Sequence, residues 1–489
     1  MEETFEPVSH AIAGHAQAVQ RPLCVDLDGT LTKVDTLYDT FMLMVRKNPR
    51  ALLQLPGWLA GGKANLKAHL TNTVSLDVTR LPYNQALLGY LHVQREHGRP
   101  IFLATGADRQ LAERVAAHLG LFDGVLASDG ASNLTGKTKL AKFRQFFSNG
   151  AFDYIGNAMP DLELLAASVE PKLANPSGVL RGSLRARGIR VEQSFNDRAP
   201  FLPSAIRAIR VHQWAKNVLI FLPFILGHKW NLDVARLAFL AFLCFSFCAS
   251  STYLINDLLD MEADRHHLKK RMRPFAAGDL SVLAGLGISA LLIVLSVGCL
   301  LFLPGAFAEL LGVYFLTTLA YTFYFKRMVL LDVLALSGLY TLRLLAGGAA
   351  TSTPISHWLS GFSIFLFLSL AIVKRFSELQ NTLQGGLTPK NGRGYQLSDI
   401  EQMRSFGTAS AFAAVVVFAN YISGFDVIAL YHQPRLLWLV MPLLILWLCR
   451  VWLLASRGEL NEDPVVFALT DRMSLLIGAG VALIALLAQ

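Results

Sequence analysis

The sequence predicts two domains of different fold class: an N-terminal α/β domain with a parallel sheet, and a C-terminal all-α bundle of about nine transmembrane helices. Short apolar runs alternate with helical segments over residues 21–180, which is typical of a parallel sheet. Longer apolar segments follow residue 206, and several are about 20 residues long, enough to cross a hydrocarbon core of about 30 Å. Apolar residues make up 53% of the chain and charged residues only 16%, a balance too apolar for an ordinary soluble protein.

Charge and cysteine content exclude several classes of protein. We attribute the net charge of +9 to basic loops beside a membrane rather than to nucleic-acid binding. The five cysteines are scattered and show neither metal-ligand spacing nor a disulfide framework. Residues 1–20 are predicted to be a loose tail, because they lack the charged start and apolar core of a secretory signal.

Three buried strands are predicted in the α/β domain, at Leu23–Val25, Pro100–Ala104 and Phe152–Ile155. The first strand is followed by Asp26 and Asp28, next to a glycine turn. Functional polar residues of parallel sheets lie at the carboxyl ends of the strands. These two acids can therefore both point at one bound group.

The motifs make residues 22–180 resemble the haloacid dehalogenase superfamily of phosphatases, whose DxDGTLT signature begins here at Asp26. The helices between Asp35 and Arg99 would then form a small cap. The resemblance implies a nucleophile that accepts the phosphoryl group (Asp26), a general acid and base (Asp28), a ligand for the phosphoryl oxygens (Thr105), a cation that neutralises them (Lys139), and a second acid that helps Asp26 to hold Mg²⁺ (Asp161).

One position departs from that family's GDxxxD motif, because Asn157 stands in place of the first acid. The change removes one negative charge near the expected metal. Asp161 is expected to suffice, so the domain is predicted to be an active phosphatase. The alternative is a degenerate fold retained for docking or regulation, in which case Asp26→Asn would leave the lipid products unchanged.

A basic linker is predicted over residues 181–205, where four arginines precede Pro200 and Pro203. Basic residues just before a membrane segment favour contact with lipid headgroups on the cytoplasmic side. Plain solubilising charge is the alternative.

The membrane domain is predicted to span residues 206–489, and the first of its nine segments is short and carries Lys216 near its start. The segments are expected at 215–227, 237–255, 282–303, 306–325, 328–349, 357–374, 407–424, 435–454 and 470–488.

The stretch from Asn256 to Pro274 carries the densest charge in this domain. Asp257, Asp260 and Asp264 are three and four residues apart, so on a helix they share one face. Carboxylates gathered in this way suit Mg²⁺, and the cations that follow suit phosphates. A merely solvated helix end is the alternative, but it leaves unexplained why three acids converge where burial is costly.

Further polar residues gather on the same side of the predicted membrane domain. Arg343 lies inside the fifth segment, where a charge is expensive unless it is paired or faces a cavity. We interpret the set as a pocket that binds a phosphorylated substrate and a membrane-dissolved partner; ion pairs that only hold loops together are the alternative. The remaining members are Lys216, Tyr321, Lys326, Lys374, Arg375 and Glu378.

Residues 206–489 resemble the UbiA superfamily of intramembrane prenyltransferases, through NDxxDxxxD at Asn256–Asp264 and KxxRP at Lys270–Pro274. The resemblance implies nine helices around a cavity that opens to the lipid. It also implies that the first motif binds Mg²⁺ and a diphosphate, and that cations of the second contact phosphate oxygens. The residues concerned are Asn256, Asp257, Asp260, Asp264, Lys270 and Arg273.

A second Asp-rich motif is typical of relatives that prenylate aromatic rings, but here that place reads KRFSEL, with Glu378 as its only acid. In this respect the chain resembles the branch typified by decaprenyl-phosphate phosphoribosyltransferase. That resemblance implies phosphoribosyl diphosphate and a polyprenyl phosphate as substrates. Lys374 and Arg375 are then expected to hold the lipid phosphate or the 5-phosphate.

Together the two domains predict a two-step enzyme that transfers phosphoribose to a polyprenyl phosphate and then removes the 5-phosphate. The first alternative moves a polyprenyl chain from its diphosphate to an aromatic or quinone-precursor acceptor, with the N-terminal domain as a regulator. The second is a transporter, which the lack of a clear internal repeat disfavours.

Loop charges predict the orientation of the chain in the plasma (inner) membrane. Basic residues concentrate in the connections after the even-numbered segments, whereas the connections after the third and fifth carry no charge. This alternation places the even loops and the N-terminal domain in the cytoplasm and the C-terminus outside. We therefore expect a reporter fused after Gln489 to lie outside; a cytoplasmic reporter would contradict this topology.

Overall fold

A computed structural model describes residues 21–147, 151–384, 394–460 and 464–489 of the protein. The predicted tail, residues 1–20, lies outside the described residues. The chain forms two compact units that are not continuous in sequence. The first comprises residues 1–205 and 258–282, and the second comprises residues 206–257 and 283–489.

A six-stranded sheet, entirely parallel, organises the first unit, as the sequence predicted. The strand order is β3-β2-β1-β4-β5-β6, so the chain runs outward from β1 in both directions. The strands are β1 (Leu23–Val25), β2 (Ile101–Asp108), β3 (Gly124–Ser128), β4 (Asp153–Gly156), β5 (Pro171–Ala174) and β6 (Gln193–Phe195).

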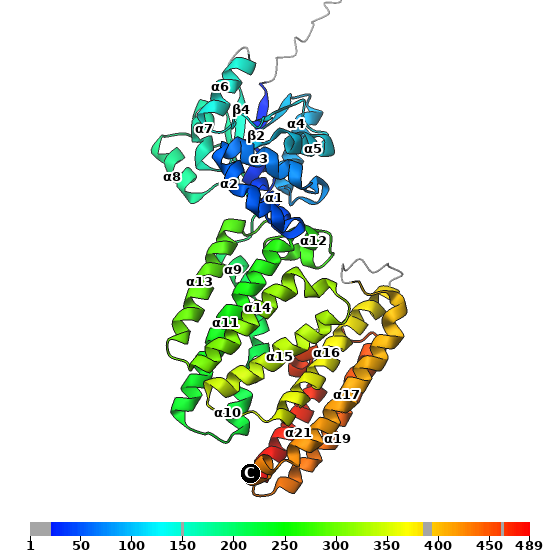
Figure 1. The fold of residues 1–489 in the computed structure, drawn as a ribbon. Coiled ribbons are helices and arrows are strands. Elements are labelled where there is room, and N and C mark those ends of the chain that lie inside the picture. Colours follow the sequence, from blue (N-terminus) through cyan, green and yellow to red (C-terminus); the bar gives the residue numbers. More distant parts are fainter. Residues whose placement is uncertain (1–20, 148–150, 385–393, 461–463) are drawn as a thin grey trace, which may run out of the picture. The chain divides into compact units, whose positions relative to one another are not determined.

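Helices cover both faces of this sheet, with α4 and α5 on one side and α6, α7 and α8 on the other (Figure 1). Alternation along β1 explains this, because Leu23 and Val25 belong to one buried cluster and Cys24 to another. The helices are α1 (Thr36–Lys47), α2 (Leu55–Ala60), α3 (Gly62–Thr73), α4 (Gln85–Glu96), α5 (Arg109–Leu119), α6 (Lys137–Phe146), α7 (Leu162–Ala167) and α8 (Gly178–Ala186).

The α/β fold continues past residue 180 into the stretch that the arginines indicated as a linker. Helix α8 ends at Ala186, and residues 193–195 form the edge strand β6, paired in parallel with β5. The arginine cluster led to the prediction of a linker, although the chain here contains a strand of three residues.

The first unit also includes the segment after α11 (Leu232–Leu259). This segment contains the short helix α12 (Met261–Arg265) and the single 3₁₀ turn η6 (Lys270–Met272). Phe275 and Ala276, which follow them, are buried.

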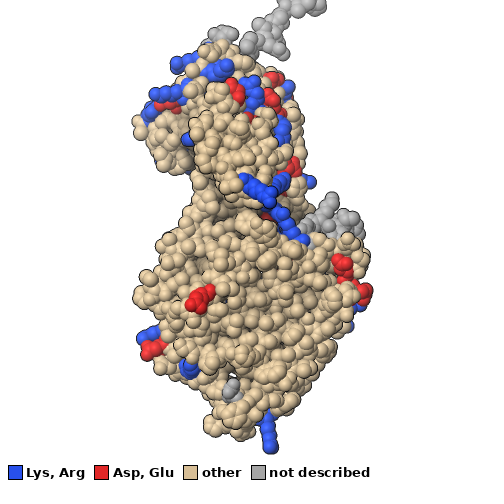
Figure 2. Space-filling model, in the orientation of Figure 1, with Lys and Arg blue, Asp and Glu red and all other residues tan. Residues whose placement is uncertain are grey.

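Long apolar helices make up the second unit, and most of the surface visible there carries no charge (Figure 2). Its core is made of several buried clusters of apolar side chains. The helices after α11 are α13 (Val282–Leu300), α14 (Gly305–Phe323), α15 (Leu331–Ala350), α16 (His357–Gln384), α17 (Ile400–Ile422), α18 (Phe425–Leu430), α19 (Val440–Ser456), α20 (Pro464–Thr470) and α21 (Arg472–Ala488).

Seven helices of the described chain are long and apolar enough to cross a membrane, so the predicted count of nine is not confirmed. The last predicted segment is the apolar helix α21, which has 17 residues. The first predicted segment forms the 3₁₀ stretch η5 (Val211–Phe221) and the short α10 (Leu222–Leu226). Pro223 lies in the first turn of α10, the part of a helix in which proline is tolerated.

Helix α15 packs against the backbone of η5 at a glycine, which gives a test of this packing. A Cβ on Gly347 would lie 2.2 Å from the carbonyl oxygen of Ile220, and that backbone cannot move aside. We expect Gly347→Ala to destabilise the protein by about 1–3 kcal/mol through overpacking. Gly338→Ala on the same helix is the control, because nothing lies within 4 Å of its added Cβ. Equal melting temperatures for the two variants in detergent would contradict this packing.

Candidate functional site

The side chains predicted for phosphoryl transfer meet at the carboxyl ends of β1 and β4. The Nζ of Lys139, in α6, donates to Oδ1 of Asp26 at 2.8 Å and lies 3.9 Å from Oδ1 of Asp161. All three side chains are buried. The structure thus brings together three of the predicted residues, although Asp26 is more than 100 residues from the other two in sequence.

Asp161 is held by a set of donors that the sequence prediction did not include. The hydroxyl of Tyr154 donates to its Oδ1 at 2.8 Å, and Lys139 in turn donates to that hydroxyl at 3.0 Å. The backbone N–H groups of Asn157 and Ala158 donate to its Oδ2. Tyr154 was missed because the sequence shows it only as an aromatic residue in a buried strand.

Asp28 lies in the turn Leu27–Leu31 and is oriented by the start of α1. The backbone N–H and the hydroxyl of Thr36 donate to its Oδ1 at 2.8 and 2.7 Å. The turn needs a glycine at position 29, where φ is +74° and an added Cβ would lie 2.1 Å from the side-chain nitrogen of Asn157. Asn157 therefore packs directly against the turn that carries both acids.

Burial changes the acidity of the two catalytic candidates. It raises the pKa of Asp26 to about 7, although the charge of Lys139 acts to lower it. It also raises the pKa of Asp28 to about 7, and the charge of Asp35 adds to this effect. Burial alone would lower the pKa of Lys139, but Asp26 and Asp161 raise it above its usual value. A carboxyl with a pKa near neutrality is suited to protonate a leaving oxygen.

Thr105 is also buried, at the end of β2, where its hydroxyl accepts a hydrogen bond from the backbone N–H of Ala107. Lys67 of α3 is a further cation of this site that the sequence did not single out. Its Nζ donates to the carbonyl of Gly106 at 2.5 Å, and its charge acts on the pKa of Asp28. Only the folded cap brings Lys67 here, since it lies 39 residues from Gly106.

Mg²⁺ is usually bound by one or two protein carboxylates together with phosphate oxygens. Asp26 and Asp161 would supply these two carboxylates. Asp161 already accepts three hydrogen bonds, so Asp26 offers the more open oxygens. A polar pocket of about 360 Å³ opens beside Asn157 and is lined also by Asn175 and Asn196, which follow β5 and β6.

In the second unit, the predicted Asp motif begins on α11 with two paired side chains. Arg210 contacts both carboxylate oxygens of Asp257, with its Nη2 2.6 and 2.7 Å from them. The Nζ of Lys326, predicted as a substrate ligand, donates to Oδ1 of Asn256 at 3.3 Å. Asp257 is buried, so the arginine compensates for the loss of water.

The rest of the motif lies in the first unit and is paired in the same way. Arg46, at the end of α1, lies 3.2 Å from Oδ1 of Asp260. Arg273 donates to Oδ2 of Asp264 at 2.6 Å. Lys270, the other predicted phosphate ligand, begins η6 and is half-buried.

Arg343 is buried inside α15 and is held by neutral groups. Its guanidinium donates to Oδ1 of Asn217, to the carbonyl of Leu339 and to the hydroxyl of Tyr314. Among the described residues it contacts no carboxylate. Aromatic rings surround it instead, with centroids 5.0–5.4 Å from its Cζ, and the ring of Tyr340 also faces the Nζ of the predicted ligand Lys216. Arg343 thus remains a net positive charge in an apolar setting.

Arg375, by contrast, is neutralised within the fold. Its Nε donates to Asp332 at 2.7 Å, its Nη1 donates to both oxygens of Glu378 at 2.9 Å, and its Nη2 donates to the hydroxyl of Tyr321. Three predicted site residues therefore meet at Arg375, together with Asp332. The preceding Lys374 is partly exposed on α16, and it is better placed than Arg375 to hold an anion.

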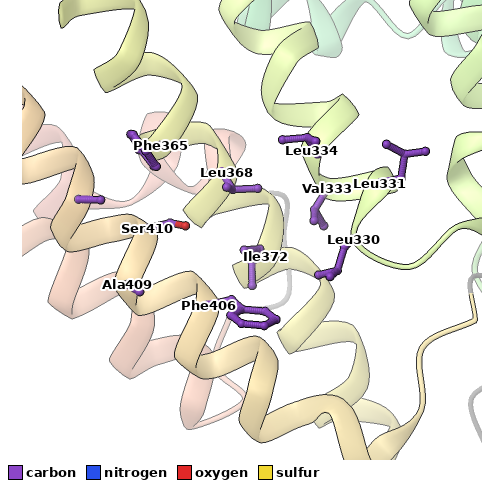
Figure 3. Close-up of a pocket in the computed structure, with 11 residues that line it drawn as sticks. Leu330, Leu331, Val333, Leu334, Phe365, Leu368, Ile372, Phe406, Ala409 and Ser410 are labelled. Atoms are coloured by element: carbon purple, nitrogen blue, oxygen red, sulfur yellow. The ribbon is translucent and has the colours of Figure 1, made fainter.

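An apolar pocket of about 610 Å³ lies beside this cluster, between α15, α16 and α17 (Figure 3). Leu331 and Val333, which flank Asp332 in sequence, line the pocket, and so does Ile372, three residues before Arg375. Ser410 is the only polar residue of its lining. Its size and lining suit a hydrocarbon chain.

No group of three or more His, Cys, Asp or Glu side chains in the described residues is arranged to hold a metal ion. The acids of the Asp motif instead face arginines, so Mg²⁺ would fit only together with anions that take over those arginines. A magnesium diphosphate meets this condition, because it supplies a cation for the acids and phosphate oxygens for the arginines.

Comparison with known proteins identifies relatives of both parts of the chain. A protein designated y4nM from Sinorhizobium fredii is 37% identical over 464 residues, or 94% of this chain and 90% of its own length. Nodulation protein NoeC from Azorhizobium caulinodans is 34% identical over 58% of this chain and 92% of its own length. Decaprenyl-phosphate phosphoribosyltransferase from Corynebacterium glutamicum is 37% identical over 45% of this chain and 67% of its own length.

Residues 218–476 match the UbiA prenyltransferase family. This range is more than half of the chain and contains the whole Asp motif and the KRFSEL stretch. The seven apolar helices agree with a multi-pass membrane protein. The chain therefore belongs to the UbiA prenyltransferase family.

Proposed function

We propose that this protein transfers 5-phosphoribose from phosphoribosyl diphosphate to a polyprenyl phosphate, and that its N-terminal domain then removes the 5-phosphate. The observation that carries the proposal is the KRFSEL stretch, which lacks the second Asp-rich motif of relatives that prenylate rings and has the partly exposed Lys374 instead. The 37% identity to decaprenyl-phosphate phosphoribosyltransferase from Corynebacterium glutamicum supports the same choice. Two phosphorylated substrates need cations at this second place, whereas a ring acceptor does not.

In the transfer step, an oxygen of the lipid phosphate attacks the anomeric carbon of the ribose, and diphosphate leaves. Mg²⁺, when bound, would neutralise the charge that develops on the diphosphate. Asp257, Asp260 and Asp264 would hold the metal. The arginines now paired with these acids would turn to the phosphate oxygens, so no buried charge loses its partner during the exchange.

Within the second unit, Arg343 and the apolar pocket are two further features that suit the proposed substrates. Arg343 offers a buried positive charge with neutral partners only, which suits a phosphate of either substrate. The pocket between α15, α16 and α17 would hold part of the polyprenyl chain. Lys374, two residues after Ile372 of the pocket lining, would contact the lipid phosphate.

In the second step, a carboxylate oxygen of Asp26 would attack the 5-phosphate and form an aspartyl phosphate. Asp28 would protonate the leaving ribose oxygen. It would then take a proton from a water molecule, and that water would attack the aspartyl phosphate and release phosphate. Lys139 would neutralise the phosphoryl oxygens. Mg²⁺ held by Asp26 and Asp161 would add to this neutralisation. Fusion to the transferase raises the local concentration of product at this site.

An assay with the purified full-length protein in detergent tests the proposal. Phosphoribosyl diphosphate, a polyprenyl phosphate and Mg²⁺ are supplied, and the lipids are identified by mass spectrometry. We expect polyprenyl-phosphoryl ribose from the unaltered protein. Asp26→Asn should accumulate the same lipid with its 5-phosphate, because the nucleophile is lost while transfer continues.

Two controls make this assay decisive. Removal of Mg²⁺ with a chelator should abolish transfer, and Asp257→Asn should do the same. No lipid-linked phosphoribose, together with prenylation of an added aromatic acceptor from polyprenyl diphosphate, would reject the proposal in favour of a ring-prenylating enzyme.

A further inference from the structure

Helix α1 of the α/β domain packs against the segment that carries the second half of the Asp motif. Both elements belong to the first compact unit. Ion pairs join them along the helix, and the backbone adds a further contact, because Arg46 also donates to the carbonyl of Leu259. The pairs are Asp39 with Arg265, Arg46 with Asp260, and Lys47 with Glu262.

The pair between Asp39 and Arg265 differs from the other two in its burial. The Nη2 of Arg265 lies 2.6 Å from Oδ2 of Asp39, and the two side chains are only 5% and 1% exposed. The Oδ1 of Asp39 is buried and has no hydrogen-bond partner. Arg265 also donates through its Nε to the carbonyl of Ala276, which ties the end of α12 to the buried segment that follows η6.

A buried ion pair of this kind is a poor device for stability alone. Removing two charges from water costs much of what their attraction returns, and apolar side chains of similar volume often stabilise as well or better. Its distinct property is that it allows one arrangement only, since any other would leave a charge unpaired. Arg265 directly follows Asp264 in sequence, so an arrangement imposed on Arg265 extends to that acid.

We propose that Asp39 and Arg265 are positioning residues for the transferase reaction, through which the N-terminal domain holds Asp260 and Asp264 ready for a magnesium diphosphate. The inference rests on one part of the proposed function, namely that the Asp motif binds a diphosphate. Helix α1 then serves both reactions. Its first residue, Thr36, orients Asp28, and one turn later Asp39 holds the diphosphate-binding segment.

Binding of inorganic diphosphate to the full chain in detergent, measured by titration calorimetry with and without Mg²⁺, tests this inference. We expect Asp39→Asn to weaken the Mg²⁺-dependent affinity by roughly tenfold or more, the scale at which small misplacements act. Asp39→Glu keeps the charge but lengthens the side chain, and we expect a smaller loss in the same direction. It serves as the test variant if Asp39→Asn does not fold.

Lys47→Ala is the matched control, because the Lys47 side chain is 51% exposed and such pairs contribute little. Its affinity should stay within about twofold of the unaltered protein. Melting temperatures of the same samples separate positioning from stability. A lower melting temperature with unchanged diphosphate affinity in the Asp39 variants would overturn the inference. An unaltered protein that binds no diphosphate would overturn both this inference and the proposed function.

Discussion

The cost of burying charge is the constraint on which both proposed reactions depend. Lys139 is tolerated in the core because Asp26 and Asp161 lie beside it. Asp257 is tolerated because Arg210 contacts both of its oxygens. In the proposed function, such pairs would open for a ligand that carries both signs of charge. A phosphate with Mg²⁺ would meet this condition, because it could replace each partner without leaving a charge unpaired.

Arg343 is an exception to this pairing, because no carboxylate of the described residues contacts it. It is buried among aromatic rings and neutral hydrogen-bond acceptors, so no opposite charge cancels its own. Arg375 on the next helix is cancelled by Asp332 and Glu378. The contrast makes the first arginine the better candidate for binding an anion in the proposed function, whereas the second joins α15 to α16 through Asp332. Sequence position alone gives both the same description, a cation within an apolar helix.

Features encoded over a few residues were predictable. The strand Leu23–Val25, the acids that follow it and the motif around Asp257 all depend on local spacing, and the structure has the strand at the predicted residues. Lys139 was found through the family resemblance, in a helix expected to open after Gly136 and observed to begin at Lys137. The last predicted segment agrees with α21.

Features that depend on distant partners were not predictable. Tyr154 links Lys139 to Asp161, yet in sequence it is only an aromatic residue in a strand. Asp39 and Arg265 are 226 residues apart. Asp39 belongs to no motif, and Arg265, which follows the Asp motif, does not reveal in sequence which acid it contacts. The first apolar segment was predicted as a helix from composition, but most of it is 3₁₀ stretch. Only Asn217, Ile220 and Pro223 are buried within η5 and α10, so hydropathy gave no sign that the helix would be irregular.

The most direct test of the central claim, that one chain performs both steps, is mass spectrometry of lipids from cells with and without the gene for this protein. The account predicts a polyprenyl-phosphoryl ribose that is present only with the gene. It also predicts that an Asp26→Asn allele replaces this lipid with its 5-phosphorylated form. A lipid profile that does not change between these cells, or a prenylated aromatic compound that appears only with the gene, would contradict it.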